Sequence, residues 1–158
     1  MPHRPDSGTN RLVVFTLGDR RYGLPLSAVD RIVRVVDVIS LPKAPNIVLG
    51  VVNVQGRIIP VINVRRRFHL PDREIILTDQ MVIARTTRRS VALVVDSVDG
   101  VVEYSKLEAV AAQDVLPGLE YVEGVMKLDD ELILIHDLDR FLSLEEEAAL
   151  DRALITDS

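Results

Sequence analysis

The amino-acid sequence predicts an all-β fold that ends in a helix and contains two small β-barrels. Short runs of Val, Ile and Leu recur along the chain and are separated by turn residues, which is typical of buried strands. The chain also resembles itself, because residues 12–33 align with residues 81–102, and residues 49–68 align with the stretch that begins at Glu123. Repeated units of this kind bury their apolar faces by packing together, so we expect the two barrels to share one core.

Composition makes that core aliphatic and excludes several kinds of site. The 158 residues are 47% hydrophobic but only 4% aromatic, and tryptophan is absent. Cysteine is also absent, which excludes disulfides, thiolate catalysis and zinc–sulfur centres. The first ten residues are polar, so we expect a disordered tail and no signal peptide. The sequence has no apolar run of about 18 residues, and a soluble cytoplasmic protein without membrane insertion is therefore expected.

Charge is distributed unevenly along the chain. Residues 1–90 carry 15 Lys/Arg against 7 Asp/Glu, a balance of +8, whereas residues 91–158 carry 4 against 17, a balance of −13. Two solvated halves can differ in this way by chance. The asymmetry can also favour head-to-tail association, in which a basic half meets an acidic half and gains association rate and register more than affinity.

The first half of the chain is expected to form strands. Apolar runs rich in β-branched residues occupy four places, at residues 12–17, 22–24, 35–39 and 58–64. Gly18 and Asp19 supply a turn between the first two runs. Pro60 lies inside the fourth run and cannot donate a ladder hydrogen bond, which indicates an edge position or a bulge.

One helical turn is also expected in this half of the chain. Ser27 is followed three residues later by Asp30, a spacing that resembles a capping box, so a helical turn is expected over residues 28–33. We expect one domain made of two pseudo-repeated halves that exchange strands. The domain is expected to span residues 11–155, and its two halves residues 12–75 and 80–142.

The second half repeats the strand pattern and then changes to a helix. Aliphatic runs of strand length occupy residues 81–84, 91–95, 101–102, 125–128 and 132–135. Ser143 and Glu146 have the spacing of a capping box, and residues 145–155 predict a helix whose first glutamates suit its positive N-terminus. Leu150 and Leu154, four positions apart, would pack this helix onto the strands.

Candidate catalytic and metal-binding residues are few. His136 is followed by Asp137 and could share a metal with it, but neighbouring residues of a strand point to opposite faces, so a partly buried structural histidine is expected. Asp129, Asp130 and Glu131 lie between two apolar runs, where a polar hairpin turn is expected instead of a pair of catalytic carboxylates. The sequence therefore predicts no catalytic residue, no metal and no cofactor.

The run Arg65, Arg66 and Arg67 is the remaining motif with recognisable chemistry. Arginines in such a run could contact the phosphates of nucleic acid. Strand alternation would send them to both faces, however, and the chain offers few aromatic side chains on which bases could stack. The acidic second half would also repel nucleic acid. Nucleic-acid binding is therefore a less favoured alternative, and an enzyme with an unrecognised site is less favoured still.

Several segments, taken in order, resemble the CheW coupling-protein family of bacterial chemotaxis and the related regulatory domain of the kinase CheA. The first segment is VVFTLGDRRYGLPLSAVDRIV, which contains the pattern Phe-x-Leu-Gly-x-x-x-Tyr-Gly. The others are LPKAPNIVLGVVNVQGRIIPVINVRRRF, VALVVDSVDGVV, EGVMKLDDELILIHDLDRFL and the closing SLEEEAAL. The resemblance covers the chain from about Leu12 to the final helix.

This resemblance implies a fold, a function and partners. Members of the family have two intertwined, five-stranded SH3-like barrels and no catalytic activity. They bridge the cytoplasmic tips of methyl-accepting chemoreceptors to the CheA histidine kinase, and they alternate with the regulatory domain of the kinase in rings. The resemblance therefore implies a non-catalytic cytoplasmic scaffold, and we expect it to be monomeric when free. The alternative within this class is a coupling protein of another chemosensory-type pathway, such as one that governs twitching or gliding motility.

The resemblance also implies a docking site for a receptor helix at the groove between the barrels. In the family, the segment that matches Gly50–Pro60 commonly reads Gly-Val-x-Asn-x-Arg-Gly-x-x-x-Pro, and helix docking needs an apolar floor with a few polar contacts. The receptor-facing residues implied by position are Val29, Arg31, Ile32, Gly50, Asn53, Gln55 and Gly56. The other interpretation is that Asn53 and Gly56 only form a turn, and the two interpretations are compatible.

Two positions depart from the family pattern. Gln55 stands where arginine is usual, and Asn63 replaces a frequent aspartate in the following strand. A glutamine can hydrogen-bond but cannot form a charge-assisted pair. The loss of two opposite charges leads to the hypothesis that a salt bridge between these positions has become a neutral pair.

The surface expected to face the kinase lies on the acidic barrel. Its predicted residues are Met81 and Val82, on an edge strand, and Asp129 and Asp130, in a turn. Contacts between barrels of this kind bury an apolar centre and keep charged residues around the rim.

Overall fold

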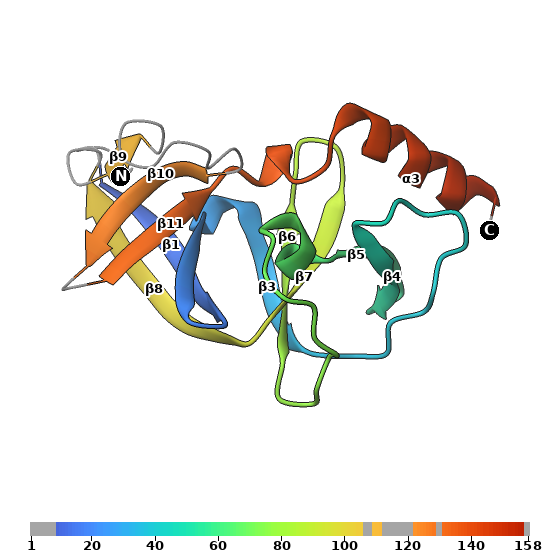
Figure 1. Ribbon diagram of the computed structural model, residues 1–158, viewed down its shortest axis with the longest axis horizontal. Helices are drawn as coiled ribbons and strands as arrows, with labels where there is room; N and C mark the ends of the chain where they lie inside the picture. The colour runs from blue at the N-terminus through green and yellow to red at the C-terminus, as the bar shows by residue number, and fades with distance from the viewer. Residues whose placement is uncertain (1–8, 106–108, 112–121, 129–130, 157–158) are drawn as a thin grey trace. The chain divides into compact units, whose positions relative to one another are not determined.

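The computed structural model describes residues 9–105, 109–111, 122–128 and 131–156, which form a mostly β structure with a C-terminal helix (Figure 1). The strands are β1 Thr9–Leu17, β2 Arg20–Pro25, β3 Val29–Arg34, β4 Val48–Val54, β5 Arg57–Ile62, β6 Gln80–Arg85, β7 Ser90–Val95, β8 Ser97–Ser105, β9 Ala109–Ala111, β10 Val122–Leu128 and β11 Glu131–His136. The helical segments are η1 Leu26–Ala28, α1 Val64–Arg67, η2 Leu138–Arg140 and α3 Leu144–Thr156. The predicted class, all-β with a C-terminal helix, is confirmed.

The chain divides into two compact units, and each unit takes its residues from two separate stretches. Unit 1 contains Met1–Val29 and Asp96–Leu138, and unit 2 contains Asp30–Val95 and Asp139–Ser158. The first hairpin, β1–β2, therefore belongs with the strands from β8 onward, whereas β6 and β7 belong with β4 and β5. Contacts between distant parts of the sequence consequently build both units.

Unit 1 is built on a six-stranded sheet with the order β8-β1-β2-β11-β10-β9. Strand β1 pairs antiparallel with β2 and β8, and β2 pairs in parallel with β11. The sheet has one strand more than the five that the resemblance implied, because the short β9 pairs with β10. The core of the unit gathers the buried residues Leu12, Val14, Met126, Ile133 and Ile135.

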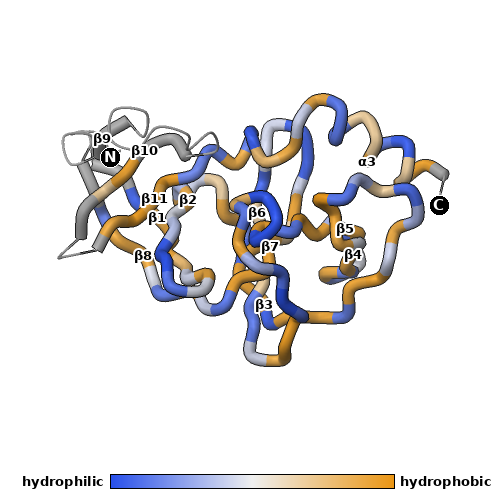
Figure 2. The backbone as a smooth tube through the Cα atoms, in the orientation of Figure 1, coloured by the Kyte–Doolittle hydropathy of each residue, from blue (hydrophilic) through white to orange (hydrophobic). Residues whose placement is uncertain are grey.

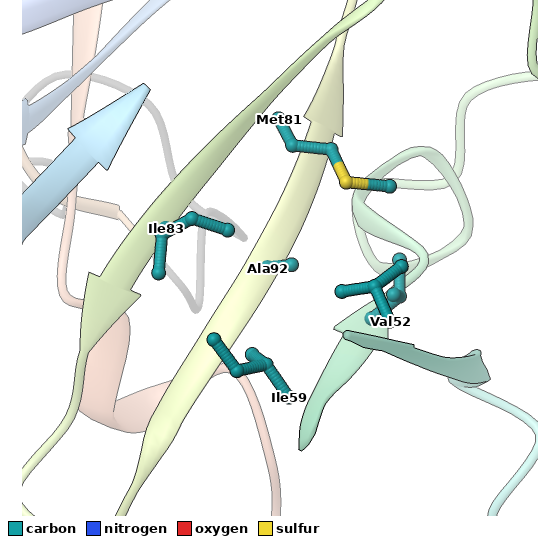
Figure 3. Packing of buried hydrophobic residues seen from close by; sticks show 6 residues of the cluster. Val52, Ile59, Met81, Ile83 and Ala92 are labelled. Carbon is teal, nitrogen blue, oxygen red and sulfur yellow. The ribbon is translucent and has the colours of Figure 1, made fainter. Parts of the chain in front are cut away.

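Unit 2 is built on a five-stranded sheet with the order β3-β6-β7-β5-β4. The pairs β6–β7 and β4–β5 are antiparallel, and β5 joins β7 in parallel through Val61 and Ile62. Alternate strand residues point to one face of a sheet, and here they form a buried aliphatic cluster (Figure 3). Its members are Val52, Ile59, Val61, Met81, Ile83 and Ala92.

Helix α3 begins at the predicted capping box and packs on unit 2. The backbone N–H of Glu146 donates to Ser143 Oγ at 3.1 Å, and the backbone N–H of Ser143 donates to Glu146 Oε1 at 2.8 Å. This reciprocal pair satisfies two donors that the first turn of a helix otherwise leaves free. Leu150 of the same helix is buried, as predicted, whereas Leu154 is only partly buried and Ala153 is buried next to it.

The first half of the chain differs from the predictions in several places, one of which is the run at residues 58–64, where β5 ends at Ile62 and α1 begins at Val64. Residues 28–33 do not form a helical turn, because the short η1 ends at Ala28 and β3 follows at once as a strand of unit 2. Residues 35–39 form no strand beyond an isolated bridge between Ile39 and Val51. Strand β1 begins at Thr9, inside the stretch expected to be disordered. Pairing of β3 within the unit 2 sheet, and of β1 with β8, overrides the local signals at residues 29–33 and 9–10.

The predicted edge position of Pro60 is wrong, because Pro60 lies in β5, which has neighbours on both sides in the sheet order. Its partner in β4 is Val51, and the register shift of this pair lies between Val48 and Gly50. The pairing of β5 with β7 includes only Val61 and Ile62, so Pro60 lies outside that ladder. A strand proline is tolerated at such a place because no donor is needed there.

Hydropathy follows the strands of both sheets. Figure 2 shows hydrophobic residues concentrated along the strands, with hydrophilic residues at most of the connections between them. Within the described ranges, no helix is both long and apolar enough to span a membrane.

Candidate functional site

The two edges of the unit 2 sheet are linked by side chains at the β4–β5 turn. Strand β3 lies at one edge of the sheet and β4 at the other. Arg31 of β3 nevertheless donates from Nη1 to Oε1 of Gln55, in the β4–β5 turn, at 2.5 Å. A face that includes β3 and the β4–β5 turn therefore exists within unit 2, and we call it the turn face. It is defined by Asp30, Arg31, Ile32, Asn53, Gln55, Gly56, Arg57 and Ile58.

The β4–β5 turn has a tight two-residue geometry. Val54 pairs with Arg57, and the residues between them, Gln55 and Gly56, have φ angles of 51° and 84°. Positive φ at both central positions is the pattern of a type I′ turn, which joins antiparallel strands with the correct twist. The backbone N–H of Gly56 donates to Asn53 Oδ1 at 2.8 Å and fixes the turn from inside the hairpin.

Two arginines share one carboxylate on the turn face. Oδ2 of Asp30 lies 3.6 Å from Arg31 Nε and 3.8 Å from Arg57 Nη1. Arg57 also donates from Nη2 to Ser90 Oγ at 2.8 Å, which connects the face to the start of β7. The three charged side chains remain between 41% and 53% exposed, so the network is accessible to a partner.

A glycine is required at position 50 because the backbone of Ile39 lies too close to leave room for a side chain. The φ of Gly50 is 155°, and a Cβ placed on it would lie 2.3 Å from the carbonyl oxygen of Ile39. Ile39 and Val51 exchange two backbone hydrogen bonds of 2.8 Å at this point. Gly50 thus lets the segment after β3 pair with the outer edge of β4, and its role here is to allow that pairing.

Exposed aliphatic side chains accompany the charged network. Ile32 on β3 is 40% exposed, and Ile58 on β5, next to Arg57, is 57% exposed. Ile39 and Val36, on the segment after β3, are also exposed. Aliphatic side chains beside a few oriented polar groups are the composition of a protein-docking surface.

The structure brings together five of the seven predicted receptor-facing residues. Arg31, Ile32, Asn53, Gln55 and Gly56 belong to the turn face. The sixth, Gly50, is buried and acts through the backbone. The seventh, Val29, begins β3 and is counted with unit 1.

Sequence reasoning missed four residues of this network or its surroundings: Asp30, Arg57, Ile58 and Ser90. Arg57 and Ile58 immediately follow the predicted turn, and Asp30 precedes Arg31, so their proximity in sequence was a usable signal. The expected helical turn over residues 28–33 hid the position of Asp30. Only a strand at these positions pairs with the sheet and brings Asp30 to Arg57.

The predicted kinase-facing residues need a correction. Strand β6, which carries Met81 and Val82, lies between β3 and β7 and is not an edge strand. Both side chains are fully buried, and Met81 belongs to the core cluster of unit 2 (Figure 3). A partner could not reach them without disrupting the core. Asp129 and Asp130 lie outside the described residues.

The hypothesis that Gln55 and Asn63 form a neutral pair is wrong. Gln55 precedes β5 and Asn63 follows it, so the six-residue strand separates them by about 20 Å at the usual rise per residue. Each has another partner, because Gln55 accepts from Arg31 and Asn63 Oδ1 accepts from the backbone N–H of Arg66 at 2.9 Å. Asn63 is therefore the N-cap of α1.

The arginine run considered for nucleic-acid binding, Arg65 to Arg67, contacts other residues of unit 2. Arg66 donates to the carbonyl oxygen of Asn46 and forms an ion pair with Asp72 at 3.0 Å. Arg67 forms an ion pair with Glu146 at 2.7 Å, and its side chain is only 12% exposed. Arg65 donates to the carbonyl oxygen of Pro71 at 3.5 Å. These contacts give the arginine run a structural role in α1 and around it.

His136 is fully buried in unit 1. Its ring stacks on Tyr22 with centroids 5.1 Å apart and an interplanar angle of 26°. Tyr22 stacks in turn on Phe15 at 5.9 Å. Burial in a stack of rings agrees with the structural role expected for this histidine.

Comparison with known proteins identifies the family. The sequence matches the CheW-like domain over residues 11–146, which is most of the chain. The chain belongs to the CheW-like domain family. Relatives include the chemotaxis protein CheW of Treponema pallidum (strain Nichols), which is 30% identical over 142 residues that cover 86% of this chain and 84% of the relative.

A second relative and a solved structure also match the chain over most of its length. The chemotaxis protein CheW of Rhizobium meliloti (strain 1021) is 28% identical over 146 residues, which cover 90% of this chain and 94% of the relative. The crystal structure of the scaffolding protein TtCheW from Thermoanaerobacter tengcongensis superposes with a TM-score of 0.79 at 28% identity, covering 87% of this chain and 94% of that chain. Sequence and fold therefore agree on the same family.

Proposed function

We propose that this CheW-like chain is a non-catalytic coupling protein of a chemosensory system, which links the cytoplasmic tip of a methyl-accepting chemoreceptor to the regulatory domain of a CheA-type histidine kinase. Family membership supports the scaffold role in chemotaxis signalling. The observation that carries the receptor contact is the turn face, where Arg31 and Gln55 join the two sheet edges beside exposed isoleucines.

Receptor docking on the turn face agrees with the physical character of that face. An amphipathic helix that docks needs apolar contact area and a few fixed polar partners. Ile32 and Ile58 offer the apolar area, and the Arg31–Gln55 pair offers a fixed polar group. Val29 stays a predicted contact.

The kinase contact stays a prediction for Asp129 and Asp130. Met81 and Val82 are not proposed as contacts, because their side chains are buried. Such a scaffold would add binding free energy and geometry, and control of kinase activity would be a population shift between states of the kinase.

Co-sedimentation tests the coupling role directly. The full chain is mixed with a soluble cytoplasmic receptor fragment and the kinase encoded in the same genome, and autophosphorylation is measured in the assembled pellet. We expect the chain to bring both proteins into one complex and to change the phosphorylation rate. Failure of the chain to bind either protein would contradict the proposed function.

A substitution at Gln55 tests whether the turn face is the receptor contact. Gln55→Arg places a second cation next to Arg31, which would lose its acceptor. We expect a changed affinity for the receptor fragment, measured by titration calorimetry, without loss of fold by circular dichroism. An unchanged affinity for every cognate receptor would remove Gln55 from the contact.

A further inference from the structure

The charged network of the turn face is not explained by a contribution to stability. Arg31 and Asp30 are each 41% exposed and Arg57 is 53% exposed. Ion pairs with this exposure are screened by water and salt, and they stabilise a fold very little. The distances of 3.6 and 3.8 Å from Asp30 to the two guanidinium groups are also longer than hydrogen bonds. The network is therefore poorly suited to hold the sheet edges together by itself.

The network does carry an excess positive charge at a defined place. Two guanidinium groups share the single carboxylate of Asp30, which leaves one positive charge unbalanced. Each guanidinium has five N–H donors, and Arg31 uses one of them on Gln55 while Arg57 uses one on Ser90. Donors therefore remain for a further acceptor, and a carboxylate matches guanidinium geometry best.

We propose that Arg31 and Arg57 together bind one carboxylate of the receptor helix. The inference rests on the proposed function, because it assumes that a receptor helix docks on the turn face. It adds the chemical group that is recognised and one residue, Arg57, that the resemblance does not imply.

Gln55 acts as a positioning residue in this arrangement. Its backbone is held in the turn with a φ of 51°, and its Oε1 accepts from Arg31 at 2.5 Å. A neutral acceptor orients the guanidinium without cancelling its charge, which a carboxylate at the same position would do. Gln55→Glu is therefore expected to weaken binding as much as Arg31→Gln does, although it strengthens the contact inside the chain.

The test is a titration of full-length variants with a soluble cytoplasmic receptor fragment at low and high NaCl concentrations. We expect Arg31→Gln and Arg57→Gln each to raise the Kd about tenfold, since a charge-assisted pair is lost, and to flatten its dependence on salt. Arg34→Gln is the matched control, because Arg34 is exposed on the same strand, lies outside the turn face, and changes the net charge equally.

Replacement of each Glu and Asp of the receptor fragment by its amide completes the test. One of these replacements should raise the Kd of the native chain but not that of Arg31→Gln, which identifies the bound carboxylate by a double-mutant cycle. If Arg31→Gln and Arg57→Gln bind as the control does, the inference is overturned while the proposed function stands. If the native chain does not bind the receptor fragment, the proposed function itself fails.

Discussion

The guanidinium of Arg67 lies 2.7 Å from the carboxylate of Glu146, and this ion pair joins α1 to α3 across 79 positions of the chain. The same carboxylate accepts from the backbone N–H of Ser143 at 2.8 Å, so it completes the capping box as well. Nearby, Phe68 and Phe141 meet edge to face with centroids 5.5 Å apart. Glu146 thus connects the start of α3 to the body of unit 2.

Removal of the Glu146 charge should loosen α3. Glu146→Gln keeps the size of the side chain but loses the charge-assisted pair, and we expect a loss of about 1 kcal/mol in the free energy of unfolding for this partly exposed site. Glu145→Gln is the control in the same turn, because Glu145 is exposed. Urea unfolding followed by circular dichroism gives both values. Equal stabilities for the two variants would contradict a special role for Glu146.

The contribution of Glu146 should depend on pH. Burial raises the pKa of Glu146, but the hydrogen bond and charge of Arg67 and the hydrogen bonds of Ser143 outweigh it, so the pKa lies below its ordinary value of 4.5. A lowered folded-state pKa means that the stabilisation is complete above about pH 4.5, the unfolded value, and is lost as the pH falls through the folded value. The stability difference between the native chain and Glu146→Gln should therefore shrink from pH 7 to pH 3. A difference that stays constant would show that charge is not its source.

A second arginine holds α3 with a more deeply buried pair. Arg89 donates from Nε to Glu147 Oε1 at 2.8 Å, with side-chain exposures of 15% and 5%, and it also pairs with Asp151. Arg89→Met leaves the carboxylate of Glu147 buried without its cation and should cost about 3–5 kcal/mol.

The double variant Arg89→Met with Glu147→Leu distinguishes charge from packing in this pair. Replacing both partners with apolar residues should recover most of the loss, because no buried charge is then left unbalanced. Thermal or urea unfolding of the single and double variants gives the comparison. A double variant as unstable as Arg89→Met would assign the loss to packing.

The two glycines of the β4–β5 region should respond differently to alanine. Gly50→Ala places a Cβ at 2.3 Å from the Ile39 carbonyl, so the Ile39–Val51 bridge must shift. We expect a loss of about 2–3 kcal/mol from backbone strain and the broken bridge. A Cβ on Gly56 would have no atom within 4 Å, so Gly56→Ala should lose only the strain of a side chain at a φ of 84°, about 1 kcal/mol of stability. Denaturant midpoints check this order, and the reverse order would refute the steric argument.

Asn63 should tolerate aspartate but not alanine. Its Oδ1 accepts from the backbone N–H of Arg66 as the N-cap of α1, and an aspartate oxygen can do the same. Asn63→Asp is therefore expected to keep the native stability, whereas Asn63→Ala should lose about 1 kcal/mol. If Asn63→Asp instead restored binding of Gln55→Arg to a receptor fragment, the separation of the two residues along β5 would have to be reconsidered.

Local sequence patterns determined the elements that local physics controls. The apolar runs at residues 12–17, 81–84, 91–95 and 132–135 became strands because their side chains bury on a pleated surface. The start of α3 was equally predictable, since Ser143 and Glu146 satisfy each other within four residues. The family, too, was visible in the order of its segments.

Only the tertiary structure decided the features that depend on contacts between distant residues. Residues 29–34 became a strand, and Met81 and Val82 became core, because β3 and β7 lie on the two sides of β6 in one sheet. The turn face exists because Arg31 meets Gln55 across 24 positions of the chain. Local propensity contains no information about such partners, since the free energy that fixes them comes from sheet pairing and burial formed after the chain has folded back on itself.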